Sequence, residues 1–184
     1  MQGPRFEPHV TIQGDLDLPR DQLLALARMM AAQTGVLHWP VQGIETGGHF
    51  FRCIYLRFAE TPAFAALQQA SRTSAGTALG LSPYAHLSLV YSEPHADNAR
   101  TSGLLAGQYH GRSITFDRIA LVRSFSSIPI AEWETVATFA LTATGEFQPM
   151  TLPALHIPDG RRHDLACLGR LAVDRAWQGQ GVGR

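Results

Sequence analysis

Two similar tripeptides, His-Val-Thr at positions 9–11 and His-Leu-Ser at 86–88, carry the side chains best suited to chemistry. Each lies in a run of alternating apolar residues, which is typical of a half-buried strand. Residues two apart in a strand point to the same face, so His9 shares a face with Thr11, and His86 shares one with Ser88. Two such strands side by side place two imidazoles and two hydroxyls on one surface. That set suits acid–base chemistry on a phosphate ester.

Opening a cyclic phosphate requires two opposite proton transfers, which two histidines can supply. One neutral imidazole removes a proton from the attacking water, and one imidazolium protonates the departing ribose oxygen. The unperturbed pKa of histidine, about 6.5, allows either role near neutral pH. Thr11 and Ser88 would donate hydrogen bonds to the non-bridging phosphate oxygens. We therefore predict His9 and His86 as catalytic residues, with no metal and no cofactor.

A single His-x-Thr motif would be weak support, because a strand histidine beside a hydroxyl is usually a packed, half-buried pair. Two copies in matching apolar frames are a far more specific pattern. One alternative function involves the same side chains without catalysis. It is a binding module for nucleotides or RNA ends, in which the histidines only bind phosphate.

The composition predicts one domain, or a small domain with an appendage, in 184 residues. Hydrophobic residues make up 45% and charged residues 16%, as in an ordered globular protein. Fifteen basic and fifteen acidic residues cancel, which argues against DNA as a partner and leaves a small phosphorylated ligand. Cys53 and Cys167 lie far apart without metal-ligand spacing. No apolar run suits a membrane span or a signal peptide, so we expect a cytoplasmic monomer.

The pattern along the chain predicts strands alternating with helices, with one histidine motif in each half. The expected elements are a strand at 8–12, a helix at 18–34, a β-rich stretch at 36–58 with its clearest strand at 50–56, a helix at 62–73, a strand from 83, a helix at 96–109, and strands at 113–122 and 134–141. The order suggests two similar lobes that face one another. Trp39 and Phe51 are candidates for a base-stacking wall, although core packing is the favoured interpretation for both.

Four blocks of the sequence resemble the 2H phosphoesterases, and within them the cyclic phosphodiesterases of plant and fungal type. The blocks are Gly3–Thr11, Thr46–Leu56, Pro83–Tyr91 and Trp133–Ala137, and the resemblance runs over about 3–141. It implies an α/β (α+β) fold of two lobes, with antiparallel sheets facing a central cleft. It also implies metal-independent hydrolysis of a 2′,3′-cyclic nucleotide, or of ADP-ribose 1″,2″-cyclic phosphate, to a phosphomonoester, a reaction of RNA metabolism.

The resemblance assigns roles to five residues. His9 and His86 become the acid–base pair, Thr11 and Ser88 the phosphate binders, and Tyr91 a substrate-binding residue at the edge of the cleft. By strict alternation Tyr91 faces away from His86, so it must lie past the strand end or at a bulge to contribute. A core-packing tyrosine fits the spacing equally well.

Both ends of the chain depart from this pattern. Relatives begin with a strand and helix before the first motif; here they are missing, which predicts an unpaired strand edge beside His9. Residues 147–184 are expected to be a linker followed by a truncated, poorly packed segment similar to acetyl-CoA-dependent N-acetyltransferases, after a phosphoesterase domain at 1–146. The resemblance rests on the loop residues Gln178, Gly181 and Gly183, whose following helix would begin where the chain stops. A fragment of such a fusion is a further alternative function, although we expect no acetyl-CoA binding.

Overall fold

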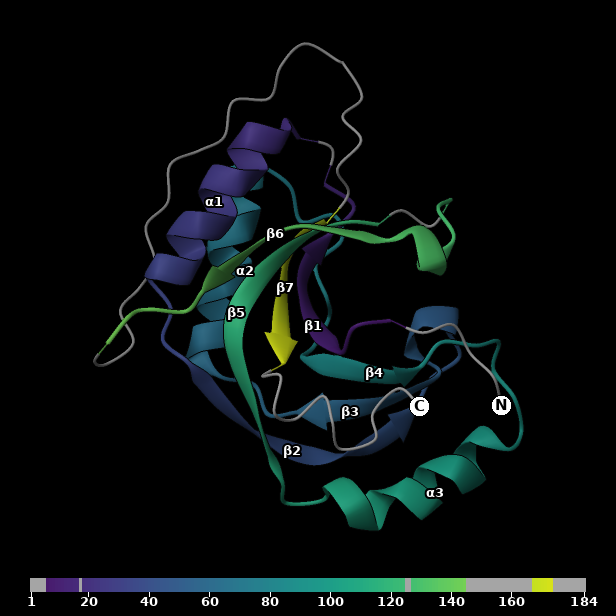
Figure 1. Ribbon diagram of the computed structural model, residues 1–184. Helices are drawn as coiled ribbons and strands as arrows, with labels where there is room; N and C mark the ends of the chain where they lie inside the picture. Colours follow the sequence, from purple (N-terminus) through teal and green to yellow (C-terminus); the bar gives the residue numbers. More distant parts are fainter. Residues whose placement is uncertain (1–5, 17, 125–126, 145–166, 174–184) are drawn as a thin grey trace.

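The computed structural model describes residues 6–16, 18–124, 127–144 and the strand at 167–173 (Figure 1). The predicted loop at Gln178, Gly181 and Gly183 and most of the predicted linker lie outside the described residues. The elements are β1 (His9–Gly14), α1 (Arg20–Ala32), β2 (Leu37–Thr46), the 3₁₀ turn η1 (Phe50–Arg52), β3 (Ile54–Phe58), α2 (Pro62–Ala75), β4 (His86–Val90), α3 (Asn98–Tyr109), β5 (Ser113–Arg123), the 3₁₀ turn η2 (Ile130–Glu132), β6 (Glu134–Ala140) and β7 (Cys167–Val173).

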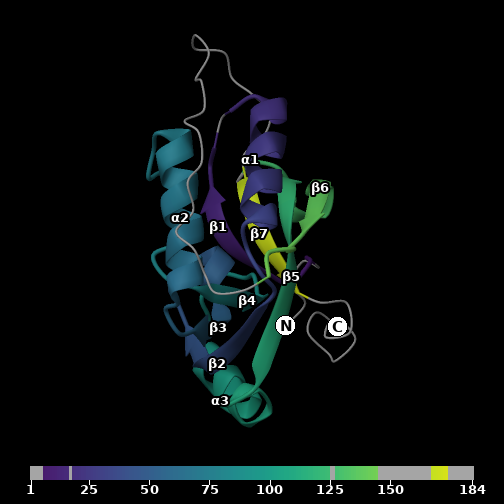
Figure 2. The same ribbon diagram turned by 90° about the vertical axis from the view of Figure 1, so that its left-hand side faces the viewer.

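The described strands form one antiparallel sheet, in the order β2-β3-β4-β1-β7-β5-β6. An additional pairing of β2 with β5 closes all of these strands except β6 into a ring, and β6 continues outside it from β5. The predicted α+β class is confirmed. The strands of the two expected lobes are hydrogen-bonded to one another, because β1 pairs with β4 and β2 pairs with β5 across the halves. Helices α1 and α2 lie side by side along the strands, and α3 packs against β2 and β3 (Figures 1 and 2).

The two long helices follow their local signals. Thr61 accepts a hydrogen bond from the backbone N–H of Phe64 at the start of α2, and Pro62 occupies the first turn. Gly76 ends α2 in the left-handed conformation with φ of 66°. Helix α1 ends at Ala32, two residues before the predicted end at 34, and the Thr34 hydroxyl donates to the carbonyl of Met30 just beyond it.

The strand predicted at 50–56 is wrong in its first half, since Phe50–Arg52 form the turn η1 and β3 begins at Ile54. His49 caps this turn: its Nδ1 accepts a hydrogen bond from the N–H of Phe51. Gly47 allows the end of β2 to pass close to the turn, because a Cβ at this position would lie 2.5 Å from the carbonyl oxygen of Arg52. His49, which directly precedes the strand predicted at 50–56, therefore has a structural role.

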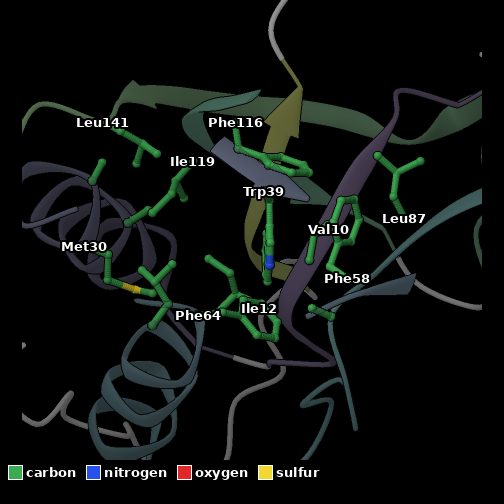
Figure 3. Packing of buried hydrophobic residues seen from close by; sticks show 14 of the residues in the cluster. Val10, Ile12, Met30, Trp39, Phe58, Phe64, Leu87, Phe116, Ile119 and Leu141 are labelled. Carbon is green, nitrogen blue, oxygen red and sulfur yellow. The ribbon is translucent and has the colours of Figure 1, made fainter. Parts of the chain in front are cut away.

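A hydrophobic core joins the sheet to α1 and α2 (Figure 3). Trp39 of β2 lies at its centre, with its ring against those of Phe58, Phe64 and Phe116. The indole N–H donates to the carbonyl of Ala59 over 2.8 Å, so the buried side chain satisfies its polar atom. Trp39 is thus a core residue, the interpretation that the sequence favoured over a base-stacking wall.

The expected unpaired edge beside His9 is not found, because β7 pairs with β1 along the edge that faces away from β4. The register pairs His9 with Ala172 and Thr11 with Arg170. On its other side β7 pairs with β5, so it bridges β1 to the rest of the sheet. A segment expected to be poorly packed therefore contains a strand paired on both sides, and it occupies the edge of β1 that was expected to be unpaired.

Replacing Leu171 with proline should destabilise the protein if β7 is held in this position. Leu171 pairs with Val10 on one side and Ile119 on the other. Proline removes the backbone N–H and distorts a ladder bordered by strands on both sides, with an expected loss of about 1–3 kcal/mol in the free energy of unfolding. Urea unfolding followed by circular dichroism measures the loss, and Leu171→Ile, which keeps the N–H, is the control. Equal stability of the two variants would show that β7 contributes nothing to the sheet.

Candidate functional site

The two histidine motifs lie on adjacent antiparallel strands, β1 and β4, whose register pairs Val10 with Leu87. Continuing that register by one residue in each direction places His9 opposite Ser88 and Thr11 opposite His86. These four side chains share the face opposite to that of Val10 and Leu87, which are part of the hydrophobic core. His9 and His86 are then diagonal neighbours, which lie about 7–8 Å apart across a pair of antiparallel strands. The geometry has an approximate two-fold symmetry, with one imidazole and one hydroxyl from each strand.

His9 is buried, and its Nδ1 lies 2.5 Å from the carbonyl oxygen of Glu7. Since a carbonyl accepts only, Nδ1 carries the hydrogen in this contact, and Nε2 is the second nitrogen of the ring. The ring of Phe6 meets that of His9 edge-on, at 6.2 Å between centroids. The side chain is thus held by the residues that enter β1.

His86 is oriented in the same way, with Nδ1 3.1 Å from the carbonyl oxygen of Tyr84, two residues earlier. The Ser82 hydroxyl also lies 3.1 Å from this Nδ1 and donates to the same carbonyl. The rings of Tyr55 and Tyr84 both meet the imidazole edge-on. Burial lowers the pKa of His86 to about 4, and the nearby guanidinium groups of Arg52 and Arg57 act in the same direction. His86 is therefore neutral near pH 7, with Nε2 unprotonated.

The two hydroxyls of the motifs differ in their surroundings. Ser88 is buried, and its Oγ donates a hydrogen bond of 2.6 Å to the carbonyl of Phe51 in η1. To donate to a substrate oxygen, Ser88 must rotate away from this carbonyl. Thr11 is half-buried on the site face of β1. Sequence spacing alone gave no sign of this difference, because the partner of Ser88 comes from a turn more than 30 residues away.

Tyr91 lies one residue past the end of β4, as the sequence required for it to turn toward the motif face. Its buried ring stacks on that of Phe6 at 3.8 Å, and Phe6 in turn contacts His9. Phe51 and Trp133 complete the group, each with its ring at right angles or steeply inclined to that of Tyr91. Tyr91 is thus both packed in an aromatic cluster and close to the candidate catalytic pair.

Sequence reasoning missed the contribution of β3, which pairs with β4 on the side away from β1. The register places Tyr55 opposite Ser88 and Arg57 opposite His86, so both β3 side chains share the motif face. The signal in the sequence was present, because Tyr55 and Arg57 alternate with the buried apolar residues of this strand. That alternation alone does not show that the two side chains lie beside the β4 motif, which follows only from the register of β3 with β4.

Within the described residues, no three histidine, cysteine or acidic side chains are grouped so that they could hold a metal ion. The same part of the chain contains no helix with the length and apolar character of a membrane span. The side chains that β1, β3 and β4 bring to the motif face carry imidazole, hydroxyl, phenol and guanidinium groups.

Comparison with known proteins gives one informative match. No protein-family model matches the chain. The chain is similar to a cyclic phosphodiesterase of Arabidopsis thaliana, with 28% identity over 140 residues, covering 73% of this chain and 77% of the relative. The similarity spans most of both proteins and is not confined to a single motif.

Proposed function

We propose that this protein hydrolyses a cyclic phosphodiester to a phosphomonoester. The observation that carries the proposal is the pairing of β1 with β4, which brings His9, Thr11, His86 and Ser88 to one face. The similarity to a protein named cyclic phosphodiesterase supports the same reaction. The proposed substrate is a small molecule, either a 2′,3′-cyclic nucleotide or ADP-ribose 1″,2″-cyclic phosphate, of the kind expected for the plant and fungal enzymes.

His86 acts as the general base in this mechanism. Its Nδ1 is committed to the Tyr84 carbonyl and its lowered pKa keeps Nε2 unprotonated, so Nε2 accepts a proton from the attacking water. The water oxygen forms a new bond to phosphorus, and the bond from phosphorus to one ribose oxygen breaks. His9, oriented by the Glu7 carbonyl, donates a proton from Nε2 to that departing oxygen.

The hydroxyls of Thr11 and Ser88 stabilise the charge on the non-bridging oxygens as the phosphorus becomes five-coordinate. Tyr91 binds the organic part of the substrate, and its aromatic neighbours hold its ring in place. The reaction needs no metal, so a chelator such as EDTA is expected to leave the rate unchanged. The monomeric state, the cytoplasmic location and the acetyltransferase-like character of 147–184 remain predictions from the sequence.

The dependence of kcat/KM on pH tests the role of His86. With 2′,3′-cyclic AMP as substrate, the base function should be lost only as pH falls through about 4, the pKa of His86, rather than through the usual value near 6.5. Between pH 6.5 and 4 the unfolded chain binds a proton at His86 and the folded protein does not. The free energy of unfolding therefore also decreases as the pH is lowered through this window. Circular dichroism at each pH is therefore the control.

An acid limb near pH 6.5 with the fold intact would contradict the assignment of His86 as a buried base. Binding of the cyclic nucleotide without turnover at any pH would instead favour the non-hydrolytic binding module.

A further inference from the structure

Two arginines beside His86 form a positively charged surface that the proposed mechanism does not use. Arg57 lies directly opposite His86 in the pairing of β3 with β4, and Arg52 lies in η1 just before β3. Both are half-exposed. Both guanidinium groups are close enough to His86 to favour its neutral form, which places them at the flank of the reaction site.

Tyr84 fixes the positions of the two guanidinium groups. The Cζ atom of Arg57 lies 3.7 Å from the centre of the Tyr84 ring, and that of Arg52 lies 5.6 Å from it. The ring itself is anchored, since its hydroxyl lies 2.9 Å from that of Tyr55, which donates to the Glu45 carboxylate over 2.7 Å. Burial raises the pKa of Tyr55, so this phenol stays protonated as the donor.

No carboxylate neutralises the two arginines within the described part of the chain. The ion pairs there join His95 with Asp97, Arg118 with Asp117 and Arg123 with Glu134. Glu45 is the acidic residue of this network, and its carboxylate accepts the hydrogen bond from Tyr55. Two guanidinium groups held on one ring without an acidic partner are suited to a bound anion, because the planar fork matches phosphate oxygens.

We propose that Arg57 and Arg52 form a second anion subsite, which binds a phosphate of the substrate other than the cyclic phosphate. The cyclic phosphate itself lies between the β1 and β4 motifs, whereas the arginines lie on the β3 side of His86. The inference rests on the proposed function and narrows its substrate class to cyclic phosphates that carry an additional phosphate or diphosphate group.

The test compares adenosine 2′,3′-cyclic phosphate with the same compound phosphorylated at the 5′ oxygen. In the wild-type protein kcat/KM is expected to be higher for the 5′-phosphorylated substrate. Arg57→Leu should lower kcat/KM for the 5′-phosphorylated substrate by about 10–100-fold, mainly by raising KM. It should lower kcat/KM for the unphosphorylated substrate by less than about threefold. Arg52→Gln should act in the same direction. Arg57→Lys keeps the positive charge but loses the planar guanidinium group, so its kcat/KM for the 5′-phosphorylated substrate should lie between those of the wild type and Arg57→Leu.

Arg28→Leu is the matched control, because it also removes one guanidinium stacked on a ring, here that of Phe139 on another part of the sheet. It should leave the ratio of the two kcat/KM values unchanged. An equal loss on both substrates in Arg57→Leu, or no preference for the 5′-phosphate in the wild type, overturns the subsite.

If the wild type hydrolyses neither compound, the proposed function fails, and the subsite is then decided by calorimetry. Tighter binding of adenosine 3′,5′-bisphosphate than of adenosine 3′-phosphate, lost in Arg57→Leu, would support it. Equal binding of the two would overturn it.

Discussion

Replacing His86 with alanine is expected to lower kcat for cyclic phosphate hydrolysis by about 10²–10⁴-fold. The loss follows from the geometry: His86 presents Nε2 on the motif face while Nδ1 is bound to the Tyr84 carbonyl. Among the described side chains that contact or flank it, Tyr55 and Tyr84 are phenols and Arg57 is cationic, so none of these three can take its place as the base. His9→Ala should cause a loss of similar size, since it removes the proton donor for the leaving oxygen.

Steady-state rates with 2′,3′-cyclic AMP measure this effect, and His38→Ala is the matched control. His38 lies exposed on β2, where its Nδ1 contacts the Thr115 hydroxyl, and its removal should leave kcat unchanged. The two motif variants should also bind the product, since the hydroxyls of Thr11 and Ser88 remain. Full activity of either His9→Ala or His86→Ala would exclude the two-histidine mechanism.

Replacing Trp39 with alanine is expected to lower the free energy of unfolding by about 3–5 kcal/mol. The indole is 2% exposed and contacts three phenylalanine rings, so truncation leaves a cavity in the centre of the core. The Ala59 carbonyl also loses its donor. Because β2 pairs with both β3 and β5, the loss falls on the strand that closes the ring.

Chemical unfolding followed by far-ultraviolet circular dichroism measures the change without relying on tryptophan fluorescence, which the substitution itself alters. Leu104→Ala is the control: this α3 side chain is 72% exposed and should change the stability by less than about 0.5 kcal/mol. A loss below about 1 kcal/mol in Trp39→Ala would mean that the residue does not hold the core together.

Local patterns were sufficient to predict several elements and the orientation of the motif residues. Alternation around His9 and His86 indicated strands, and both are strands. The helix predicted from residue 62 is α2, which begins there. Tyr91 was expected past a strand end if it is to contribute, and it lies one residue after the end of β4. Such predictions succeed because strand periodicity and helix capping depend only on residues a few positions apart.

Local patterns failed where a backbone contact from elsewhere decides the conformation. Phe50–Arg52 have strong strand-forming side chains, yet the His49 cap and the approach of Gly47 to the Arg52 carbonyl favour a 3₁₀ turn. Ser88, which the sequence predicts as a phosphate binder, donates its hydroxyl to the Phe51 carbonyl of that same turn, a contact that spacing along the chain could not indicate.

The sequence by itself determined which side chains are candidates for the chemistry, because two His-x-Thr/Ser motifs each set one imidazole and one hydroxyl on a single strand face. Only the tertiary structure decided what surrounds them. Strand pairing is non-local, so neither the position of β7 beside β1 nor that of Arg57 opposite His86 follows from spacing along the chain. The lowered pKa of His86 likewise arises only on folding, from burial first and then from the nearby Arg52 and Arg57, and the proposed role of His86 as the base follows from it.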